Sequence, residues 1–311
     1  MSFAARTVAS LLARLARCSG RRAGAALVYH RIAADPGDPA RSVVPAHGAR
    51  VFEAQVRHLA ACYDVVPASD LVAAVRTRKR GQRFPVSVTF DDDLQSHRHV
   101  AMPVLRRHGL TGTFFVSGAS LSASHAFWWE RLQYAVDAQI PVANLVPEGL
   151  AAHSIGDLAM AIRDLPADER DAVAARLRAR LGPDPDDAGL REEDIRALAE
   201  AGCEIGMHTL RHDYLPRLDE PALARAMNEG RDRLAEVGRR PVRTIAYPHG
   251  AADGRAAAAA RAARYGVGFT TRPTAVLADD DPLLLGRLEP SFRSASRFAL
   301  RLVLTLIGRG R

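Results

Sequence analysis

The sequence predicts an α/β protein in which a parallel sheet is wrapped by helices, either open or closed into a barrel. Short apolar segments typical of strands alternate with longer segments of helical periodicity along most of the chain. Several of the helical segments end at glycine, as helix C-termini often do. The 311 residues, 48% of them hydrophobic, are sufficient to bury one large core.

Six segments have the composition of buried strands. They span residues 25–30, 85–90, 111–117, 203–208, 243–248 and 266–271. Helical patterns lie between them, over residues 52–63, 68–78, 99–109, 191–202, 219–238 and 253–266. Residues 118–190 break the alternation because they form a longer, mostly helical stretch. We therefore expect an insertion there, carried on a single domain that spans residues 23–290.

The net charge of +8 belongs to the two ends of the chain. Residues 1–22 and 291–311 each contain five arginines and no acidic residue, and without them 33 basic residues face 35 acidic ones. A nucleic-acid groove across the body is therefore not expected. The three scattered cysteines argue against a disulfide scaffold and a cysteine-rich zinc site. The single lysine, Lys79, among 43 basic residues indicates G+C-rich coding DNA, which favours a bacterial source.

Both end segments combine arginines with apolar residues at helical spacing. Arg14 and Arg17 interrupt the apolar run of residues 1–22, so a secretory signal is not expected and a cytoplasmic location is favoured. The apolar run in residues 291–311 reaches about half of the ~20 residues that span a bilayer. Two interpretations remain: basic amphipathic helices on an anionic membrane surface, or a frayed N-terminus with a C-terminal helix packed on the barrel.

Reactive side chains follow several of the predicted strands. Asp91 and Asp92 follow the second strand, His208 ends the fourth with His212 one helical turn later, and His30 ends the first. In parallel sheets, functional groups gather at the carboxyl ends of the strands. We therefore expect these side chains to share one site.

The aspartates and histidines of this set predict a divalent metal site. Carboxylates stacked at the end of a buried strand need a compensating cation. His208 and His212 are four residues apart, so both imidazoles can bind one ion. Two histidines and one carboxylate leave coordination positions open for water and substrate, as in catalytic sites. The alternative is that the aspartates cap a helix, which would suit Asp93 better than the two residues before it.

The motifs TFDDD (residues 89–93) and HTLRH (residues 208–212) resemble the first two motifs of the polysaccharide deacetylase family, the NodB-homology domain of carbohydrate esterase family four. The flanking segments LVYHRI, MPVLRRHGLTGTFFV and CEIGMHTLRHDYL agree in order, so the resemblance covers residues 25 to 290. It implies a distorted parallel (β/α) barrel of about seven strands. It also implies removal of N-acetyl or O-acetyl groups from a saccharide made for a cell-surface or exported polysaccharide.

The resemblance assigns roles to the residues of the first two motifs. Asp92, His208 and His212 would bind one divalent ion, with Zn²⁺ expected first and Co²⁺, Ni²⁺ or Mn²⁺ as alternatives. Asp91 would be the general base, because a carboxylate beside a dication stays ionised and can accept a proton from the attacking water.

The third motif of the family is present in a variant form. Tyr247, Pro248 and His249 match the Tyr-Pro-x-Gly version, so the resemblance implies that these three residues contact the substrate or the oxyanion. The backbone N–H of His249 would stabilise the oxyanion. The arginine that holds the base is then expected to be Arg287, although a surface arginine is the alternative for this residue. Arg243 is a second candidate for this role, because it precedes Pro248 by the looser spacing Arg-x4-Pro. The direction of its side chain on the predicted strand is not fixed by the sequence.

Two departures from the family pattern affect the expected chemistry. Asp93 stands where the family usually has glycine; aspartate tolerates left-handed backbone, but an extra carboxylate could alter the metal affinity or the pKa of the base. The final Leu-x-His motif, which supplies the general acid, is absent because no histidine follows His249. His30 is the first candidate for the acid and His249 the second, and a core histidine bonded to backbone is the alternative for His30. Trp128 and Trp129 could border a sugar or belong to the core.

The sequence thus predicts a metal-dependent deacetylase that cleaves a non-peptide amide C–N bond in a saccharide. One alternative is a hydrolase of a small non-sugar amide or imide on the same scaffold. The other is a saccharide-binding protein that has lost turnover, because of Asp93 and the missing terminal histidine.

Overall fold

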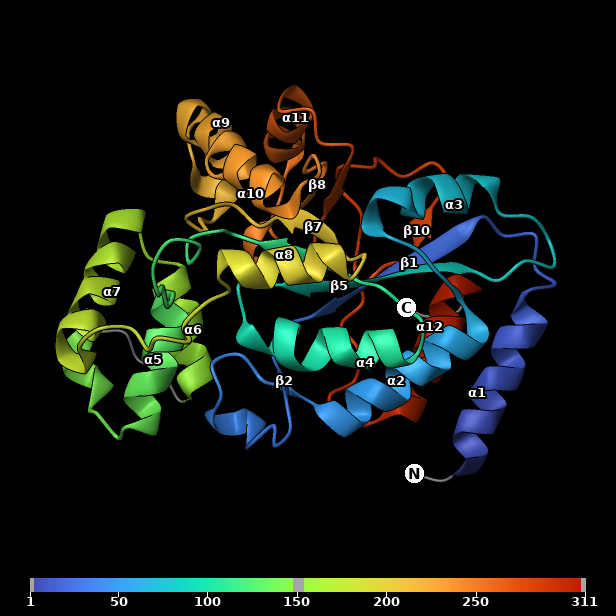
Figure 1. Ribbon diagram of the computed structural model, residues 1–311, viewed down its shortest axis with the longest axis horizontal. Helices are drawn as coiled ribbons and strands as arrows, with labels where there is room; N and C mark the ends of the chain where they lie inside the picture. Colours follow the sequence, from blue (N-terminus) through green and yellow to red (C-terminus); the bar gives the residue numbers. More distant parts are fainter. Residues whose placement is uncertain (1–2, 148–153, 309–311) are drawn as a thin grey trace.

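The main sheet of the computed structural model, which describes residues 3–147 and 154–308, is curled and mostly parallel (Figure 1). Its strands follow the order β10-β1-β5-β6-β7-β8-β9, and only β10 runs antiparallel to its neighbour. The strands are β1 (Ala23–Tyr29), β5 (Pro85–Asp91), β6 (Thr113–Val116), β7 (Glu204–Met207), β8 (Thr244–Ala246), β9 (Val267–Phe269) and β10 (Val276–Leu277). The predicted distorted parallel barrel of about seven strands is confirmed.

An irregular segment after β10 connects β9, at one edge of this sheet, to β1, next to the other edge. The N–H of Leu285 donates to the carbonyl of Gly268 in β9 at 3.0 Å, and the N–H of Leu288 donates to the carbonyl of Ala26 in β1 at 2.8 Å. A short irregular stretch of chain, and not an eighth regular strand, therefore fills the space between β9 and β1 in the barrel. Arg287 lies in this stretch, so the bridge brings it to the strand ends.

Six helices cover the outer face of the sheet (Figure 1). They are α2 (Ala49–Cys62), α4 (Met102–Arg107), α8 (Glu192–Glu200), α9 (Glu220–Asn228), α10 (Arg231–Gly238) and α11 (Gly254–Ala262). Side-chain caps fix two of the helix starts: Asp219 accepts the N–H of Ala222 before α9, and Asp253 accepts the N–H of Ala256 before α11. Minor strands are β2 (Ile32–Ala33) paired with β3 (His47–Gly48), and β4 (Asp64–Val65) paired with the start of β5.

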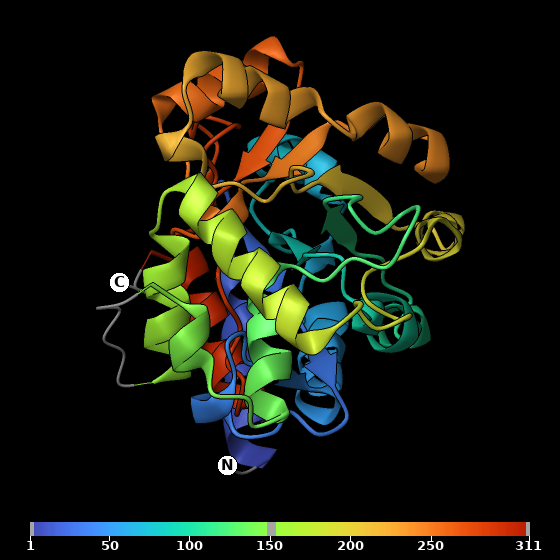
Figure 2. The same ribbon diagram turned by 90° about the vertical axis from the view of Figure 1, so that its left-hand side faces the viewer.

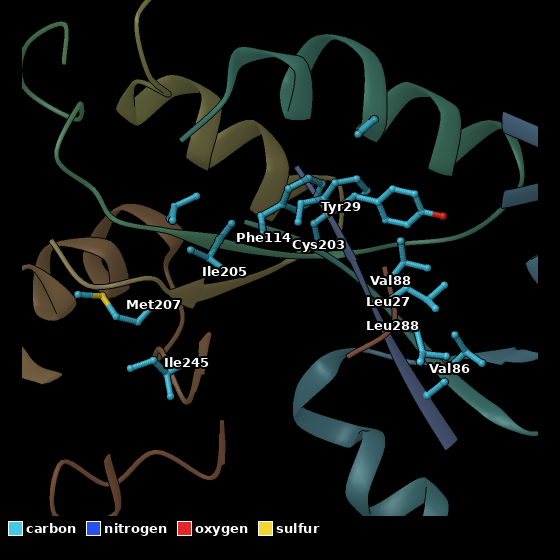
Figure 3. Close-up of a cluster of buried hydrophobic side chains, with 14 of the residues drawn as sticks. Leu27, Tyr29, Val86, Val88, Phe114, Cys203, Ile205, Met207, Ile245 and Leu288 are labelled. Atoms are coloured by element: carbon cyan, nitrogen blue, oxygen red, sulfur yellow. The ribbon is translucent and has the colours of Figure 1, made fainter. Parts of the chain in front are cut away.

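The strands bury both of their faces. Figure 3 shows Leu27, Tyr29, Val86 and Val88 in one buried cluster with side chains of β6, β7 and β8. The same cluster also contains residues of the covering helices. The four residues of β1 and β5 are two apart along each strand, so they point to the same face of the sheet. The alternate positions form a second cluster, which includes Ala26, Phe115, Ala246, Phe269 and Leu285. Continuous apolar strands are expected for a parallel sheet covered on both faces.

Helix α3 (Leu71–Thr77) packs against the amino-terminal part of the sheet. It contacts β1, β5 and β10. A Cβ added at Gly24, the second residue of β1, would lie only 2.6 Å from Cγ2 of Val75. Glycine at this position therefore permits the close approach of the helix to the strand.

The helical pattern over residues 219–238 forms two helices and not one continuous helix. Helix α9 ends at Asn228, and α10 begins at Arg231 after Gly230, whose φ is 79°. Glycine adopts this left-handed conformation readily, so the chain turns there. Apolar periodicity continues on both sides of the turn, and this is why the sequence suggested a single helix.

Residues 118–147 and 154–190 form a helical layer between β6 and α8. It contains α5 (Trp128–Asp137), the 3₁₀ turn η4 (Val142–Leu145), α6 (Ile155–Arg163) and α7 (Ala167–Leu181). These helices share their own apolar cluster, with Leu132, Ile162, Val173 and Leu177 fully buried. Figure 2 shows them in front of the curled sheet. Residues 148–153 of the predicted insertion lie outside the described residues.

Helices α1 (Phe3–Ala16) and α12 (Ala295–Leu306) occupy the two basic end segments. Helix α12 packs against α2 and β1, and α1 packs against α12 and α2. Residues 1–2 and 309–311 of these segments lie outside the described residues. Among the helices of residues 3–147 and 154–308, none is both long and apolar enough to cross a bilayer.

Candidate active site

A cavity of about 500 Å³ lies at the carboxyl ends of the parallel strands. Carboxylates and imidazoles line it from the strand side, whereas α5 and α6 of the insertion supply mostly apolar side chains on the other side. From the strand ends come Asp91, Asp92, His208, His212 and His249, and from the insertion come Trp128, Trp129, Ala159, Met160 and Arg163. The cavity therefore joins charged groups at the strand ends to an apolar wall.

Asp92, His208 and His212 converge in this cavity. The Nε2 atoms of both histidines lie 3.5 Å from Oδ1 of Asp92. One ligand atom from each residue can be chosen so that all three lie within 4.8 Å of one another, and all three side chains are buried. The residues predicted to bind a metal ion are thus close enough to share one ion.

The hydrogen bond of His208 leaves the correct nitrogen free for a metal. Its Nδ1 lies 2.8 Å from the carbonyl oxygen of Ala246, which can only accept, so Nδ1 carries the proton. In the neutral imidazole Nε2 is then unprotonated, and it faces Asp92 as in metal sites where a backbone carbonyl fixes the ligand histidine. The donor set therefore fits a divalent ion.

Left-handed backbone is concentrated in the loops that carry these residues. Asp92, Thr209, His212 and His249 have φ values of 74°, 54°, 50° and 58°, and they are four of the seven non-glycine residues with positive φ in the described parts of the chain. Such conformations cost about 1–3 kcal/mol each and cluster at functional sites. The left-handed residue of the first motif is Asp92 and not Asp93, the residue that stands in place of the family's usual glycine.

Asp91 is held by a buried arginine and not by the histidines. Nη1 and Nη2 of Arg287 donate to the two carboxylate oxygens of Asp91, both at 2.6 Å. The same guanidinium donates to the carbonyl of Thr270 at 3.1 Å, and its side chain has no exposed area. Burial by itself raises the pKa of Asp91, but Arg287 and His208 offset this effect and hold the pKa below its ordinary value. Asp91 is therefore an ionised carboxylate outside the histidine pair.

This ion pair involves Arg287, the arginine that the sequence led us to expect beside the base. Arg287 is 1% exposed and faces Asp91, so it is not a surface arginine. Arg243 is exposed, and it precedes β8 (Thr244–Ala246). The bridging segment after β10, and not the strand before the third motif, supplies the partner of Asp91.

Asp93 stabilises a loop and does not cap a helix. Its carboxylate accepts the N–H and the hydroxyl of Ser117, both at 2.6 Å, and the N–H of Gly118 at 3.2 Å. These donors lie directly after β6, where the insertion begins. Burial raises the pKa of Asp93, although the bonds from Ser117 lower it in part. The aspartate that replaces glycine therefore connects the strand end of the first motif to the start of the insertion.

The side chain of Tyr247 faces away from the cavity, which corrects the expectation that it contacts substrate. It is fully buried, and its hydroxyl donates to the carbonyl of Leu283 at 2.8 Å. Tyr247 shares the buried cluster of Ile245, two residues earlier, because alternate strand positions point to the same face. Any contact of Tyr247 with substrate would have to come from its backbone. Pro248 begins the 3₁₀ turn η6 (Pro248–Gly250), which carries His249 to the cavity.

Two histidines besides His208 and His212 also line the cavity. The ring of His249 lies 4.6 Å from that of His212, and its Nε2 is buried without a hydrogen-bond partner. Burial, together with the nearby His212 and Arg163, lowers the pKa of His249 to about 2. His30 follows β1 and is half-buried. Its backbone carbonyl oxygen lies 3.3 Å from Nε2 of His97. Its ring remains available to the cavity.

The insertion contacts the second histidine from two sides. The Trp129 ring lies 4.4 Å from the His212 ring and stacks on Phe127 at 4.4 Å. Arg170 of α7 donates to Asp213, the residue after His212, at 2.9 Å in a pair whose side chains are at most 10% exposed. The insertion therefore fixes the loop that carries a candidate metal ligand. Trp128 and Trp129 are both nearly buried, so each belongs to the core and also lines the cavity.

Sequence reasoning did not identify Arg170, Asp213 or the cavity wall formed by α6. Arg170 and Asp213 are 43 residues apart, and neither belongs to a motif. The only signal was the presence of Asp213 directly after the HTLRH motif. The α6 residues of the wall have the spacing of an ordinary amphipathic helix, so nothing in the sequence separated them from core positions.

Comparison with known proteins agrees with this fold. A family model described as polysaccharide deacetylase matches residues 78–268, which include the aspartate and histidine motifs. Because the match covers more than half of the chain, this protein belongs to the polysaccharide deacetylase family. Comparison with curated protein sequences finds no match.

Several solved structures share the fold at low sequence identity. The deacetylase PplD of Streptococcus pyogenes, described in complex with acetate, has a TM-score of 0.64 at 16% identity over 90% of this chain and 98% of its own. IcaB of Ammonifex degensii has a TM-score of 0.57 at 19% identity, covering 89% of this chain and 97% of its own. The deacetylase domain of BpsB from Bordetella bronchiseptica has a TM-score of 0.53 at 14% identity, covering 86% and 95%. At these identities the likeness concerns the fold.

Proposed function

We propose that this protein is a metal-dependent hydrolase that removes N-acetyl groups, or O-acetyl groups, from a saccharide linked to cell-surface or exported polysaccharide synthesis. One observation carries the proposal: the convergence of Asp92, His208 and His212 beside a separate carboxylate, Asp91, that is held by Arg287. Membership of the deacetylase family and the likeness to named deacetylases support it.

Asp92, His208 and His212 would hold one divalent ion. Zn²⁺ is our first choice because two imidazoles and one carboxylate are common ligands of catalytic zinc, and Co²⁺, Ni²⁺ and Mn²⁺ remain alternatives. A divalent ion at this position would supply Lewis-acid polarisation of the acetyl carbonyl and would make a nearby water more acidic.

Asp91 would act as the general base. It lines the cavity next to Asp92, and both of its oxygens accept from Arg287, so its position and its ionised state are fixed before substrate binds. An ionised carboxylate in this position can remove a proton from the water that attacks the acetyl carbon. The oxyanion that forms would accept from the backbone N–H of His249 in the turn of the third motif.

His30 would donate the proton to the departing amine. Its ring borders the cavity and is half-buried, so it can exchange protons with solvent. His249 is the less suitable candidate because its Nε2 is buried. His30→Gln and His249→Gln can be compared directly: loss of the alkaline limb of the kcat profile should occur in the variant of the true donor and not in the other.

The cavity offers surfaces that suit a saccharide. Trp128 and Trp129 supply aromatic side chains, and Arg163 and Glu289 supply charged groups for hydroxyl recognition. The volume of about 500 Å³ lies within the range of small-ligand sites. The volume suits a short segment of saccharide better than it suits a long chain bound along its length.

The proposal is tested by acetate release from N-acetylated oligosaccharides. Metal-free protein should be inactive, addition of Zn²⁺ or Co²⁺ should restore turnover, and Asp91→Asn should abolish it while retaining metal binding. Metal-dependent turnover of small amides or imides but not of saccharides would favour the alternative hydrolase. Saccharide binding without turnover under any metal would favour a binding protein, in agreement with the missing terminal histidine motif.

A further inference from the structure

The exposed leucines of this protein are concentrated on the two terminal helices. Within the described residues, five large hydrophobic side chains are exposed, and four of them belong to α1 and α12: Leu11, Leu12, Leu15 and Leu300, with exposures of 56%, 36%, 59% and 43%. The fifth, Met160, borders the cavity. Isolated exposed leucines are common, but this grouping on two helices in contact with each other is not random scatter.

Helix α1 is held in place by its opposite face. Ala13 is 2% exposed and belongs to the main core cluster, and the Ser10 hydroxyl lies 3.4 Å from Nδ1 of His58 on α2. Nη2 of Arg17 reaches the carbonyl of Cys62 at the end of α2. The helix is therefore docked on the body by one face, while Leu11 and Leu15 project from the other.

Cationic side chains surround the exposed leucines. Arg14 is exposed between them on α1, and Arg297 and Arg301 flank Leu300 on α12. Neither residues 1–22 nor residues 291–311 contain an acidic residue. Apolar residues interspersed with arginines on one helical surface are typical of helices that lie on anionic membranes.

From these observations we propose that the outward faces of α1 and α12 form a docking surface for an anionic lipid bilayer. The four leucines enter the interface, and the arginines contact the phosphate groups. A second copy of this chain is a poorer occupant, because a symmetric contact would bring arginines against arginines without an acidic residue in either segment to pair with them. The proposal does not depend on the proposed deacetylase activity.

The docking surface lies away from the insertion. In Figure 1, α1 and the helices α5–α7 lie at opposite ends of the longest axis of the molecule. Because α5 and α6 border the cavity, docking through α1 leaves this side of the cavity uncovered. A membrane-bound molecule could therefore still admit a substrate.

Vesicle binding by the full chain tests the proposal. Cys18, the exposed one of the three cysteines, lies two residues after the end of α1 and can carry an environment-sensitive fluorophore. We expect binding to vesicles that contain phosphatidylglycerol, no binding to phosphatidylcholine vesicles, and weaker binding at high salt. Leu11→Ser/Leu15→Ser should weaken binding at least about tenfold, and Arg14→Gln/Arg297→Gln should weaken it about 30-fold.

A charge-matched control is available on the insertion. Arg178 and Arg180 are exposed in the last turn of α7, so Arg178→Gln/Arg180→Gln removes the same charge and should leave vesicle binding unchanged. Circular dichroism verifies that each variant is folded. The dependence of wild-type vesicle binding on salt and on lipid composition tests the proposal without any variant. The proposal is overturned if wild-type protein ignores anionic vesicles at low salt, if the control weakens binding as much as Arg14→Gln/Arg297→Gln, or if Leu11→Ser/Leu15→Ser binds as wild type. Dimerisation that the leucine variant abolishes, without vesicle binding, would assign the surface to a second copy instead.

Discussion

Replacement of Arg287 by glutamine should reveal how strongly the base and its partner depend on each other. The side chains of Arg287 and Asp91 are 0% and 3% exposed, and two hydrogen bonds of 2.6 Å join them. Arg287→Gln leaves a carboxylate buried without its cation, which typically costs about 3–5 kcal/mol of unfolding free energy. Asp91→Asn/Arg287→Gln leaves no charge unpaired, so it should be less destabilised than the sum of the two single variants by at least about 2 kcal/mol.

Arg287→Gln should also shift the pH dependence of kcat/KM in a defined direction. Burial raises the pKa of Asp91, and Arg287 and His208 hold it below its ordinary value. The stability that comes from this depression is present above the ordinary aspartate pKa and is lost as the pH falls through the lower folded pKa. Without Arg287 the pKa of Asp91 rises, so the acidic limb of kcat/KM should move to higher pH by at least about one unit.

Urea unfolding and the pH profile of acetate release are the assays, and Arg131→Gln is the matched control. Arg131 also forms a buried two-point ion pair, with Asp184 at 2.8 and 2.6 Å, but this pair does not line the cavity. Arg131→Gln should destabilise the fold comparably and leave the pH profile unchanged. This account of the base would be refuted if the changes in unfolding free energy of Asp91→Asn and Arg287→Gln simply add in the double variant. It would also be refuted if the acidic limb of kcat/KM does not move in Arg287→Gln.

Three further substitutions test individual contacts of the site. Arg170→Gln should weaken Zn²⁺ binding about 10-fold in calorimetry, since it releases the loop that carries His212, although Arg170 itself is not a candidate ligand; unchanged affinity would limit it to a structural role. Asp93→Gly should lower the unfolding free energy by about 2–3 kcal/mol, because the buried donors of Ser117 lose their acceptor; a neutral effect in urea unfolding would contradict the assigned bonds. Tyr247→Phe should cost about 1 kcal/mol and leave kcat unchanged, because its hydroxyl is used within the core; a large fall in kcat would restore a catalytic role to this side chain.

The parts of the site that follow from strand ends could be predicted from the sequence. Parallel strands end at one edge of the sheet, so residues directly after β5 and β7 had to lie near each other once these segments were recognised as strands. Asp92, His208 and His212 come together for this reason. The position of Arg287 beside Asp91 could not be derived in the same way. Arg287 lies on the irregular segment that connects β9 to β1, and no periodicity in the sequence specifies the path of this segment.

Other features depended on information that the local sequence does not contain. The direction of Tyr247 follows from whether it shares a face with Ile245, and an apolar run of three residues does not indicate which face is the interior. The pairing of Arg170 with Asp213 depends on how the insertion folds back over the strand ends. The turn at Gly230 interrupts a helical pattern that reads continuously on both sides, and a single glycine within such a pattern is compatible with either outcome.

The most direct test of the central claim is a calorimetric titration of chelator-treated protein with Zn²⁺. The account predicts one tight site per chain, with affinity reduced at least about 100-fold in His208→Gln and in Asp92→Asn but retained in Asp91→Asn. A chain that binds no divalent ion, or variants of His208 and Asp92 that bind as tightly as the wild type, would contradict it.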